Sequence, residues 1–327
     1  MNRLLITALK WLGATGAVLT LTGPISVLAQ SYPERPLRFL VPYGPGGPTD
    51  TMARVVGQQL SEHWGRPVVI ENRPGATGNI GTGLVARATA DGYTILVHTS
   101  AFAVNPSLFR NAGYDPIRDF APVIVAGITP NMLFAHPSVA VHTLAELIAL
   151  AKAKPLSYAS PGAGTTPHLT AELLLKTMYG VDIAHIPYTS GGIAVNAVVS
   201  GQVPIGSLAI PSVVPFVKAG RLRGIVVTSA QRVAQMPDVP TVAESGHPGY
   251  EDYTWIAFLA PRATPRAIVE KLNAEISKAL KEPAAHQRLG PLGFDHSPNT
   301  PAQFADYLKR EVVKWAKVVK DSGARAD

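Results

Sequence analysis

Short runs of β-branched and apolar residues alternate along this chain with longer stretches of helical periodicity. The runs that read as strands are Leu37 to Val41, Val68 to Glu71, Tyr93 to His98, Met132 to His136, Ser157 to Ser160, Ile183 to Pro187, Ile205 to Leu208, Gly224 to Thr228 and Trp255 to Leu259. Strands that alternate with helices are typical of α/β architecture with parallel strands. We therefore predict an α/β fold with parallel or mixed sheets.

Two helices near the end of the chain show the clearest signals. Thr264-Pro265 precedes a helical pattern over Ala267 to Lys281, and Thr300-Pro301 precedes a second one over Ala302 to Lys320. Threonine is a good N-cap, and proline fits the first helical turn because its missing N–H is not needed there. Apolar residues recur at intervals of four in both patterns, so we expect both helices to pack against a core.

The first 29 residues have the layout of a secretory signal peptide. Arg3 and Lys10 precede an uncharged apolar run from Trp11 to Leu28, and a small residue, Ala29, stands before the expected cleavage site. A retained membrane anchor is the alternative, because the run is close to the shortest spanning length. Its glycines and Pro24 disfavour a stable spanning helix. We predict export to the periplasm with residues 1–29 removed.

Composition excludes several classes of protein. The chain has no cysteine, which excludes disulfides, thiol catalysis and cysteine-based metal sites. Its formal net charge of +7 is spread along the sequence without a dense Lys/Arg run. Nucleic-acid binding normally needs basic clusters interleaved with aromatic residues, so the sequence predicts no nucleic-acid partner. The positive surplus mildly favours anionic ligands.

The chain contains no low-complexity linker that would separate two consecutive domains. We therefore expect two lobes joined by strands that pass back and forth between them. The predicted first lobe comprises residues 30–128 and 253–327, and the second comprises residues 129–252.

Three glycine-rich loops follow predicted strands. They span Val41 to Asp50, Pro74 to Asn79 and Ser160 to Thr166. Glycine lets backbone N–H groups turn toward a ligand, and a helix N-terminus with bare amides attracts an anion. Each loop alone could be a plain capped turn. Three of them at carboxyl ends of strands predict a binding crevice at the edge of an open α/β sheet.

Several polar side chains near these loops have two plausible roles. Asp50 is expected to cap a helix starting near Thr51, with contact to a ligand ammonium group as the alternative. Tyr43 and Tyr188 could line a pocket or lie partly buried in a core. His168 could bond a loop or touch a ligand, and the loop contact is slightly favoured.

Motifs of common enzyme classes are missing from the sequence. It has no Gly-x-Ser-x-Gly elbow, no phosphate-binding P-loop and no His-Glu-x-x-His motif. Gly81-Thr82-Gly83 superficially matches a dinucleotide fingerprint, but it falls inside a helical pattern. His296 beside Asp295 is too little for a metal site. The sequence predicts no enzyme activity, no catalytic residue, no metal and no cofactor.

The loops and many flanking motifs closely resemble the substrate-binding proteins of tripartite tricarboxylate transporters, also called Bug proteins. The matching segments cover nearly the whole chain after residue 30 and include Tyr32-Pro33, Val41-Pro42-Tyr43, Pro45-Gly46-Gly47, Val69 to Ala76, Asp91-Gly92-Tyr93, Asn105-Pro106, Tyr114-Asp115-Pro116, His168-Leu169, Pro187-Tyr188, Pro237 to Thr241 and Gly249-Tyr250-Glu251.

The resemblance implies a two-lobed periplasmic-binding-protein fold of type II, a Venus flytrap that closes on one ligand by hinge motion. The implied ligand is a small organic carboxylate, and the implied partners are membrane subunits of a tripartite tricarboxylate-type transporter or a sensor kinase. We expect the protein to be a monomer. The implied contacts are Tyr43, Gly46, Gly47, Thr49, Ala76, Thr77, Thr99 and Ser100 in the first lobe, and Ser160, Gly164, Thr165, His168, Tyr188 and Ser207 in the second.

Two departures from the family pattern concern the ligand. Tyr188 is followed by Thr189-Ser190-Gly191-Gly192, where the family commonly has a lysine, and Ser207 is followed by Leu208-Ala209, where an aspartate is often nearby. Without an aspartate near Ser207, an amine of the ligand would have no acidic partner. We therefore expect a dicarboxylate, tricarboxylate or aromatic carboxylate without an ammonium group.

Two other classes of function fit the sequence less well. An exported α/β enzyme acting on a carboxylate lacks a recognisable set of nucleophile, base and orienting residue. The sensing domain of a transcriptional regulator would need a DNA-binding motif where this chain has its predicted signal peptide.

Overall fold

A computed structural model describes residues 32–296 and 298–322, so the predicted signal peptide lies outside the described residues. The strands are β1 (Leu37–Val41), β2 (Val68–Asn72), β3 (Thr94–Thr99), β4 (Phe120–Ala135), β5 (Ser157–Ser160), β6 (Ala184–Pro187), β7 (Ile205–Ala209), β8 (Arg223–Val227) and β9 (Tyr253–Pro261). β1 and β5 have the bounds that the sequence predicts.

Helices connect these strands. The α-helices are α2 (Pro48–Trp64), α3 (Asn79–Ala86), α4 (Ala101–Leu108), α5 (Leu144–Ala153), α6 (Thr166–Ala171), α7 (Gly191–Val199), α8 (Val214–Lys218), α9 (Arg266–Lys281), α10 (Pro283–Leu289) and α11 (Pro301–Ser322). Short 3-10 turns are η1 (Ala76–Gly78), η3 (Ile210–Ser212) and η4 (Gly290–Leu292), and a π-helical stretch, η2 (Glu172–Met178), continues α6.

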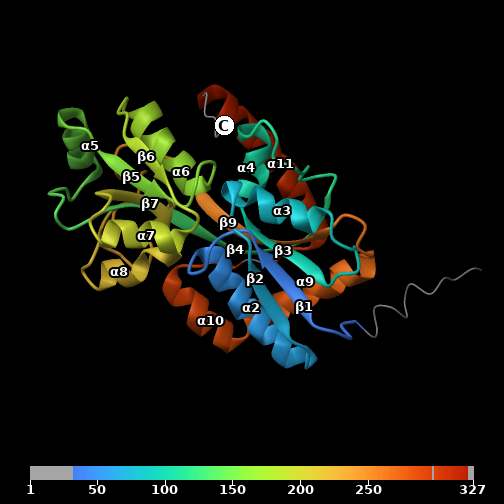
Figure 1. Ribbon diagram of the computed structural model, residues 1–327. Coiled ribbons are helices and arrows are strands. Elements are labelled where there is room, and N and C mark those ends of the chain that lie inside the picture. Colours follow the sequence, from blue (N-terminus) through green and yellow to red (C-terminus); the bar gives the residue numbers. More distant parts are fainter. Residues whose placement is uncertain (1–31, 297, 323–327) are drawn as a thin grey trace, which may run out of the picture.

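The strands form one mixed arrangement in the order β2-β1-β3-β9-β4-β7-β5-β6, with β8 also paired to β4. β4 belongs to two sheets: Phe120–Pro130 pairs with β9, while Asn131–Ala135 pairs with β7 and Met132–Ala135 pairs with β8. In Figure 1 the green and yellow middle of the chain gathers on one side, and the blue, cyan, orange and red ends gather on the other. The fold is therefore two-lobed α/β with mixed sheets, as the sequence predicts.

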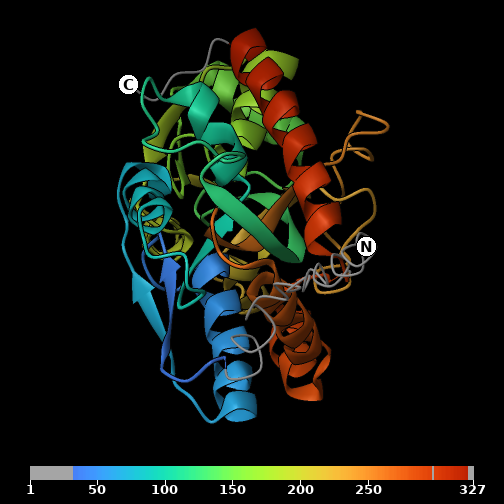
Figure 2. The ribbon, with the colours of Figure 1, turned by 90° about the vertical axis from the view of Figure 1, so that its right-hand side faces the viewer.

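Each sheet carries an apolar core on both of its faces. In the first lobe one core holds buried residues of α2, α9 and α10, and the opposite core holds buried residues of α4 and α11. Figure 2 shows α2 and α9 side by side on one face, with the red helix α11 on the other. In the second lobe α7 and α8 cover one face, and α5 and η2 cover the other.

A polar cluster joins β4 and β9 where the chain passes between the lobes. Asn131 Nδ2 donates to Asp252 Oδ2 at 3.0 Å, and Thr254 Oγ1 donates to Asn131 Oδ1 at 2.8 Å. Thr170 of α6 also donates to Asp252. Burial raises the pKa of the Asp252 carboxyl. The two crossing strands are thus linked to each other and to α6.

Some local predictions need correction. α9 begins with Pro265 at its N-cap, and Thr264 caps nothing: its Oγ1 is buried and has no hydrogen-bond partner among the described residues. The cap predicted at Thr300 is confirmed, because its Oγ1 accepts from Gln303 N at 3.2 Å and Gln303 Oε1 accepts from Thr300 N at 2.8 Å. Gly81-Thr82-Gly83 lies within α3, as predicted.

Candidate functional site

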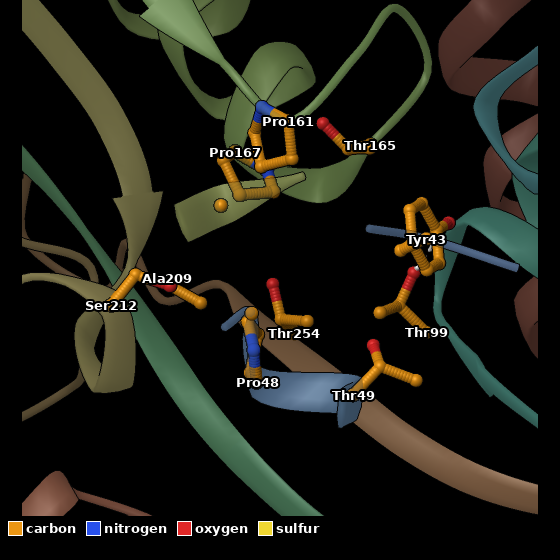
Figure 3. Close-up of a pocket in the computed structure, with 12 residues that line it drawn as sticks. Tyr43, Pro48, Thr49, Thr99, Pro161, Thr165, Pro167, Ala209, Ser212 and Thr254 are labelled. Atoms are coloured by element: carbon orange, nitrogen blue, oxygen red, sulfur yellow. Dashed lines mark hydrogen bonds between the residues drawn. The ribbon is translucent and has the colours of Figure 1, made fainter. Parts of the chain in front are cut away.

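A pocket lies between the two lobes and is lined by residues of both (Figure 3). Its empty volume is about 400 Å³, part of which is open to solvent. Its lining residues are Tyr43, Gly47, Pro48, Thr49, Thr99, Pro161, Thr165, Pro167, Gly191, Ala209, Ser212 and Thr254. Small-molecule sites occur preferentially in clefts at such interfaces.

Three helices begin at the wall of this pocket. α2 begins at Pro48, α6 at Thr166 and α7 at Gly191. The first amides of a helix have no intrahelical acceptor and carry its positive end. No side chain caps the N-terminus of α2 or of α6. The pocket therefore offers backbone donors and a positive potential to an anion.

Hydroxyl groups supply the other polar atoms of the wall. Tyr43 Oη and Thr99 Oγ1 are 3.1 Å apart, and Thr165 Oγ1 donates to Gly162 O at 2.8 Å. Burial raises the pKa of Tyr43, so its phenol is neutral at ordinary pH. None of the twelve described lining residues has a charged side chain. Recognition in this pocket depends on amides and hydroxyls.

The predicted cap at Asp50 is wrong: α2 begins at Pro48 instead of near Thr51, and its N-cap is Gly47. Asp50 instead anchors the loop that leads into this helix. Asp50 Oδ2 accepts from Gly46 N at 3.1 Å and from Arg54 Nε at 2.9 Å, and its Oδ1 accepts from Asn72 Nδ2 at 3.0 Å. Burial acts to raise the pKa of this carboxyl, but these hydrogen bonds outweigh it and hold the pKa below its ordinary value. Asp50 is therefore an ionised loop anchor outside the pocket lining.

The loop before α6 is anchored by neutral imidazoles. His168 Nδ1 accepts from Gly164 N at 3.1 Å, and the His168 ring lies 4.2 Å from the ring of His185. His185 Nε2 in turn lies 2.7 Å from Ser160 Oγ. Burial, with the nearby His185 as a second cause, lowers the pKa of His168 to about 3, and burial lowers that of His185 to about 4. Both rings are neutral near pH 7.

Loops of the two lobes touch beside the pocket. Gly44 N donates to Thr189 O at 3.2 Å, and Ser190 Oγ donates to Pro45 O at 3.5 Å. A Cβ at position 192 would lie 2.9 Å from Pro45 O, so this contact requires glycine there. The structure therefore has the lobes closed over the pocket.

Five of the predicted contacts line the pocket: Tyr43, Gly47, Thr49, Thr99 and Thr165. The other predicted contacts, Gly46, Ala76, Thr77, Ser100, Ser160, Gly164, His168, Tyr188 and Ser207, lie outside this lining. Several of those residues support the wall from behind. Ser207 Oγ donates to Pro167 O at 2.6 Å, and the hydroxyl of Ser100 bonds that of Thr166.

Seven lining residues are absent from the predicted set: Pro48, Pro161, Pro167, Gly191, Ala209, Ser212 and Thr254. Pro48, Pro161 and Gly191 belong to segments that the sequence singles out. Ser212 lies in a short turn after β7, and Thr254 lies in β9. The turn at Ser212 also follows a strand, but it contains no glycine and therefore lacks the signal that marks the other loops.

The described residues lack two features that other classes of protein need. The described residues contain no group of three His, Cys, Asp or Glu side chains arranged to hold a metal ion. Within 32–296 and 298–322, no helix has both the length and the apolar character needed to cross a bilayer.

Two lobes joined by crossing strands, with a pocket between them, are the architecture of periplasmic substrate-binding proteins. Residues 52–324 match the family described as tripartite tricarboxylate transporter family receptor. The chain belongs to this family, whose members are substrate-binding proteins and not enzymes.

Curated relatives match the chain over most of its length. The protein BugT of Bordetella pertussis is 36% identical over 330 residues, covering 99% of this chain and 99% of that protein. A protein of the tcbD-tcbE intergenic region in Pseudomonas sp. strain P51 is 38% identical over 292 residues, covering 88% of this chain and 87% of the relative.

Solved structures of similar proteins share the fold. Rpa4515 of R. palustris, solved with adipate, is 37% identical with a TM-score of 0.86, covering 90% of this chain and 99% of that one. MatC from Rhodopseudomonas palustris, with bound malate, is 33% identical with a TM-score of 0.84, covering 88% and 100%. The periplasmic binding protein BugD is 34% identical with a TM-score of 0.86, covering 90% and 99%.

Proposed function

We propose that this protein captures a small organic carboxylate in the pocket between its lobes. The closed, loaded form is then presented to membrane subunits of a tripartite tricarboxylate-type transporter or to a sensor kinase. In this proposal the protein acts as a monomer in the periplasm after residues 1–29 have been removed. Family membership supports the receptor role, and the chemistry of the pocket supports the class of ligand.

The convergence of three helix N-termini on one small pocket is the observation that carries the proposal. Each N-terminus is equivalent to roughly half a positive charge. Amides and hydroxyls satisfy carboxylate oxygens without a fixed cation.

The ligand is proposed to lack an ammonium group. The described residues that line the pocket include no carboxylate. Asp50, which directly follows the lining residue Thr49, already accepts hydrogen bonds from Gly46, Arg54 and Asn72. An ammonium group buried there would have no anionic partner, which is costly. The adipate and malate bound to two relatives support a dicarboxylate. An aromatic carboxylate is the second candidate.

The proposed lobes keep the boundaries 30–128 with 253–327, and 129–252. The change of sheet within β4, between Pro130 and Asn131, and the start of β9 at Tyr253 support a division near these positions. Closure then occurs by rotation about β4 and β9.

Thermal unfolding with a panel of mono-, di-, tri- and aromatic carboxylates tests the function. A ligand present at 100 times its Kd stabilises the native state by about 2.7 kcal/mol. We expect at least one carboxylate to raise the Tm. Stabilisation by sugars or cations and by no acid would refute the proposal, and turnover of a bound acid would indicate an enzyme.

A variant at the start of α2 tests the site. A Cβ at position 47 would lie 3.6 Å from Gly191 N, so a branched side chain there enters the pocket between α2 and α7. We expect Gly47→Val to abolish acid binding while the Tm without ligand stays close to that of the parent. If the affinity of Gly47→Val for the acid is unchanged, the loop before α2 is not part of the binding site.

A further inference from the structure

A second cavity lies where the crossing strands join the lobes. It is lined by residues of β4, by the start of β9, by segment 229–235 after β8 and by segment 293–295 after α10, and we call it the junction cavity. Its empty volume is about 870 Å³, part of which is open to solvent. Clefts at interfaces between lobes are common places for small ligands.

The junction cavity is separate from the pocket between the lobes. Successive side chains of a strand point to opposite faces of the sheet. In β9, Thr254 lines the pocket and Tyr253 lines the junction cavity. Pro130 of β4 pairs with Tyr253 and also lines the junction cavity. The two lining sets share no residue, so a ligand in one leaves the other free.

Ser229 in the wall of the junction cavity has an unpaired hydroxyl. This residue is 7% exposed, and its Oγ has no hydrogen-bond partner among the described residues. A buried polar group without a partner carries a desolvation cost, so its presence needs an explanation. A polar group of a ligand in the cavity would supply the missing partner.

Asp295 is the single charged side chain among the described residues of the lining. Its carboxylate forms no hydrogen bond or ion pair with a described residue. The neighbouring ring of His296 is neutral near pH 7, because burial lowers its pKa. Arg232, within segment 229–235, bonds Glu244 and the carbonyl of Pro237 instead. The lining thus carries a negative charge and no positive one, which favours a cation over an anion.

Two neutral acceptors accompany this carboxylate. Gln235 Nε2 donates to Gly290 O at 2.6 Å, which leaves Gln235 Oε1 to accept from a ligand. Ser229 Oγ is the other neutral acceptor. Together with Asp295 they make three acceptor groups, and a primary ammonium group has three N–H donors.

Apolar side chains make up the rest of the described lining that faces a ligand body. Ile128 and Pro130 of β4 lie beside the rings of Tyr253 and Phe294 in this lining. Tyr253 Oη accepts from Ala230 N at 3.1 Å, which fixes the ring against segment 229–235. Aromatic rings attract cations, and the aliphatic side chains suit an alkyl or aryl group.

We propose that the junction cavity is a second ligand site, which binds a small primary amine in its ammonium form. The ammonium group is held by Asp295, Gln235 and Ser229, and the apolar body of the amine lies against β4 and Phe294. This inference goes beyond the proposed function and does not depend on it, because the pocket between the lobes takes no part in the site.

NMR titration of the ¹⁵N-labelled exported protein at pH 7 tests the chemistry of the site. The probes are butylammonium, trimethylbutylammonium, which lacks N–H donors, and 1-butanol, which lacks the charge. We expect butylammonium to bind at least about 10-fold more tightly than either analogue, since hydrogen bonds to charged groups have this size. Its affinity should fall in high salt. Equal binding of the three probes, or no binding of butylammonium, would overturn the proposal.

Two variants test the contacts. Asp295→Asn keeps the shape of the side chain and removes its charge, so it should weaken butylammonium by about 10-fold and leave 1-butanol unchanged. Ser229→Ala should weaken butylammonium by about 3-fold or more. Unchanged butylammonium affinity in either variant would refute the proposed contacts. Thermal unfolding without ligand shows whether a variant disturbs the fold.

Asp306→Asn is the matched control for the charge. Asp306 is a surface carboxylate of α11, 66% exposed and outside the lining of the junction cavity. We expect this variant to bind butylammonium like the parent. An equal loss in Asp306→Asn and Asp295→Asn would mean that the amine responds only to net charge, and the site would be refuted.

Gly47→Val separates this inference from the proposed function. The variant obstructs the pocket between the lobes, so we expect it to lose acid binding and to keep the butylammonium affinity of the parent. Loss of butylammonium binding would place the amine in that pocket and overturn the second site. If the parent binds butylammonium but no acid, the proposed function fails and the second site stands.

Discussion

The loop before α2 and the loop before α6 both place a helix N-terminus at the pocket, but different side chains hold them in position. Both follow a strand, contain glycine and lead into a helix that begins at the pocket. The α2 loop is held by the ionised carboxylate of Asp50, and the α6 loop is held by the neutral ring of His168. One lobe thus uses a charge to position its amides, and the other uses none.

A protein carboxylate can lie near an anion-binding pocket when other groups compensate its negative charge. The negative charge of Asp50 is neutralised by Arg54 and by hydrogen bonds from Gly46 and Asn72, all outside the pocket lining. The α6 loop needs no such compensation, because its acceptor is uncharged. The two loops should therefore respond differently to mutation, pH and salt.

Replacement of Asp50 should give the largest effect. Asp50→Ala leaves the amide of Gly46 without its acceptor. It also removes one of the two acceptors of Asn72 Nδ2, which keeps only Tyr43 O. We expect the free energy of unfolding to fall by about 3 kcal/mol and carboxylate affinity to fall as well, measured by urea unfolding and calorimetry.

Asp306→Ala is the control for this variant. Asp306 pairs with Lys309 on the surface of α11 and is 66% exposed, so its loss should cost less than about 0.5 kcal/mol. Equal losses in the two variants would contradict the anchor role of Asp50.

Lowering the pH from 7 to 5 should affect the α6 loop and spare the α2 loop. The pKa of His168 is about 3 in the folded protein and about 6.5 when unfolded, so the unfolded state takes up the proton first. Stability is therefore lost as pH falls from about 6.5 toward 3, and His168 alone should account for about 2 kcal/mol at pH 5. The pKa of Asp50 is lowered in the folded protein, so Asp50 keeps its contribution to the free energy of unfolding until the pH falls below about 4.

His168→Gln isolates this contribution, because a glutamine oxygen can still accept from Gly164 N. His98, whose pKa burial lowers to about 3, titrates in both proteins, so its contribution to the pH dependence cancels in the difference. We expect the variant to lose less stability than the parent between pH 7 and 5 by urea unfolding. If the free energy of unfolding of the parent and of the variant falls equally between pH 7 and 5, protonation of His168 does not cause the loss.

Removal of the cation beside Asp50 should give the smallest effect. Arg54 is 48% exposed, so Arg54→Gln removes a partly screened ion pair while Gly46 and Asn72 still bond the carboxylate. We expect a loss of about 0.5 to 1 kcal/mol that shrinks in high salt. A loss as large as that of Asp50→Ala would mean that the ion pair, and not the backbone hydrogen bond, holds the loop.

The sequence predicted the regular strands well and the crossing strand poorly. β1 and β5 were predicted with their observed bounds because each is a short run ending at a glycine- or proline-containing loop. β4 was predicted only from Met132, although it begins at Phe120. Pro122 and Gly127 resemble loop residues, but the strand accommodates them at two irregularities in its pairing with β9.

For the site, the sequence predicted loops better than individual contacts. Tyr43, Thr49 and Thr165 lie at or beside the start of a helix or the end of a strand, where the position of a side chain follows from local structure. Ser212 and Thr254 reach the pocket only because the lobes close and β9 crosses between them. Such placement depends on long-range packing, which no local pattern encodes.

The pairing of β3 with β9 sets the order in which the protein can assemble. The second-lobe sheet uses a continuous part of the chain, from Asn131 to Val227, whereas β3 pairs along Leu96–Thr99 with residues of β9 far later in the sequence. Until β9 is in place, that edge of β3 is an unpaired apolar strand, which is prone to wrong pairing. The second lobe can form early, and the nascent first lobe is the part that most needs a chaperone.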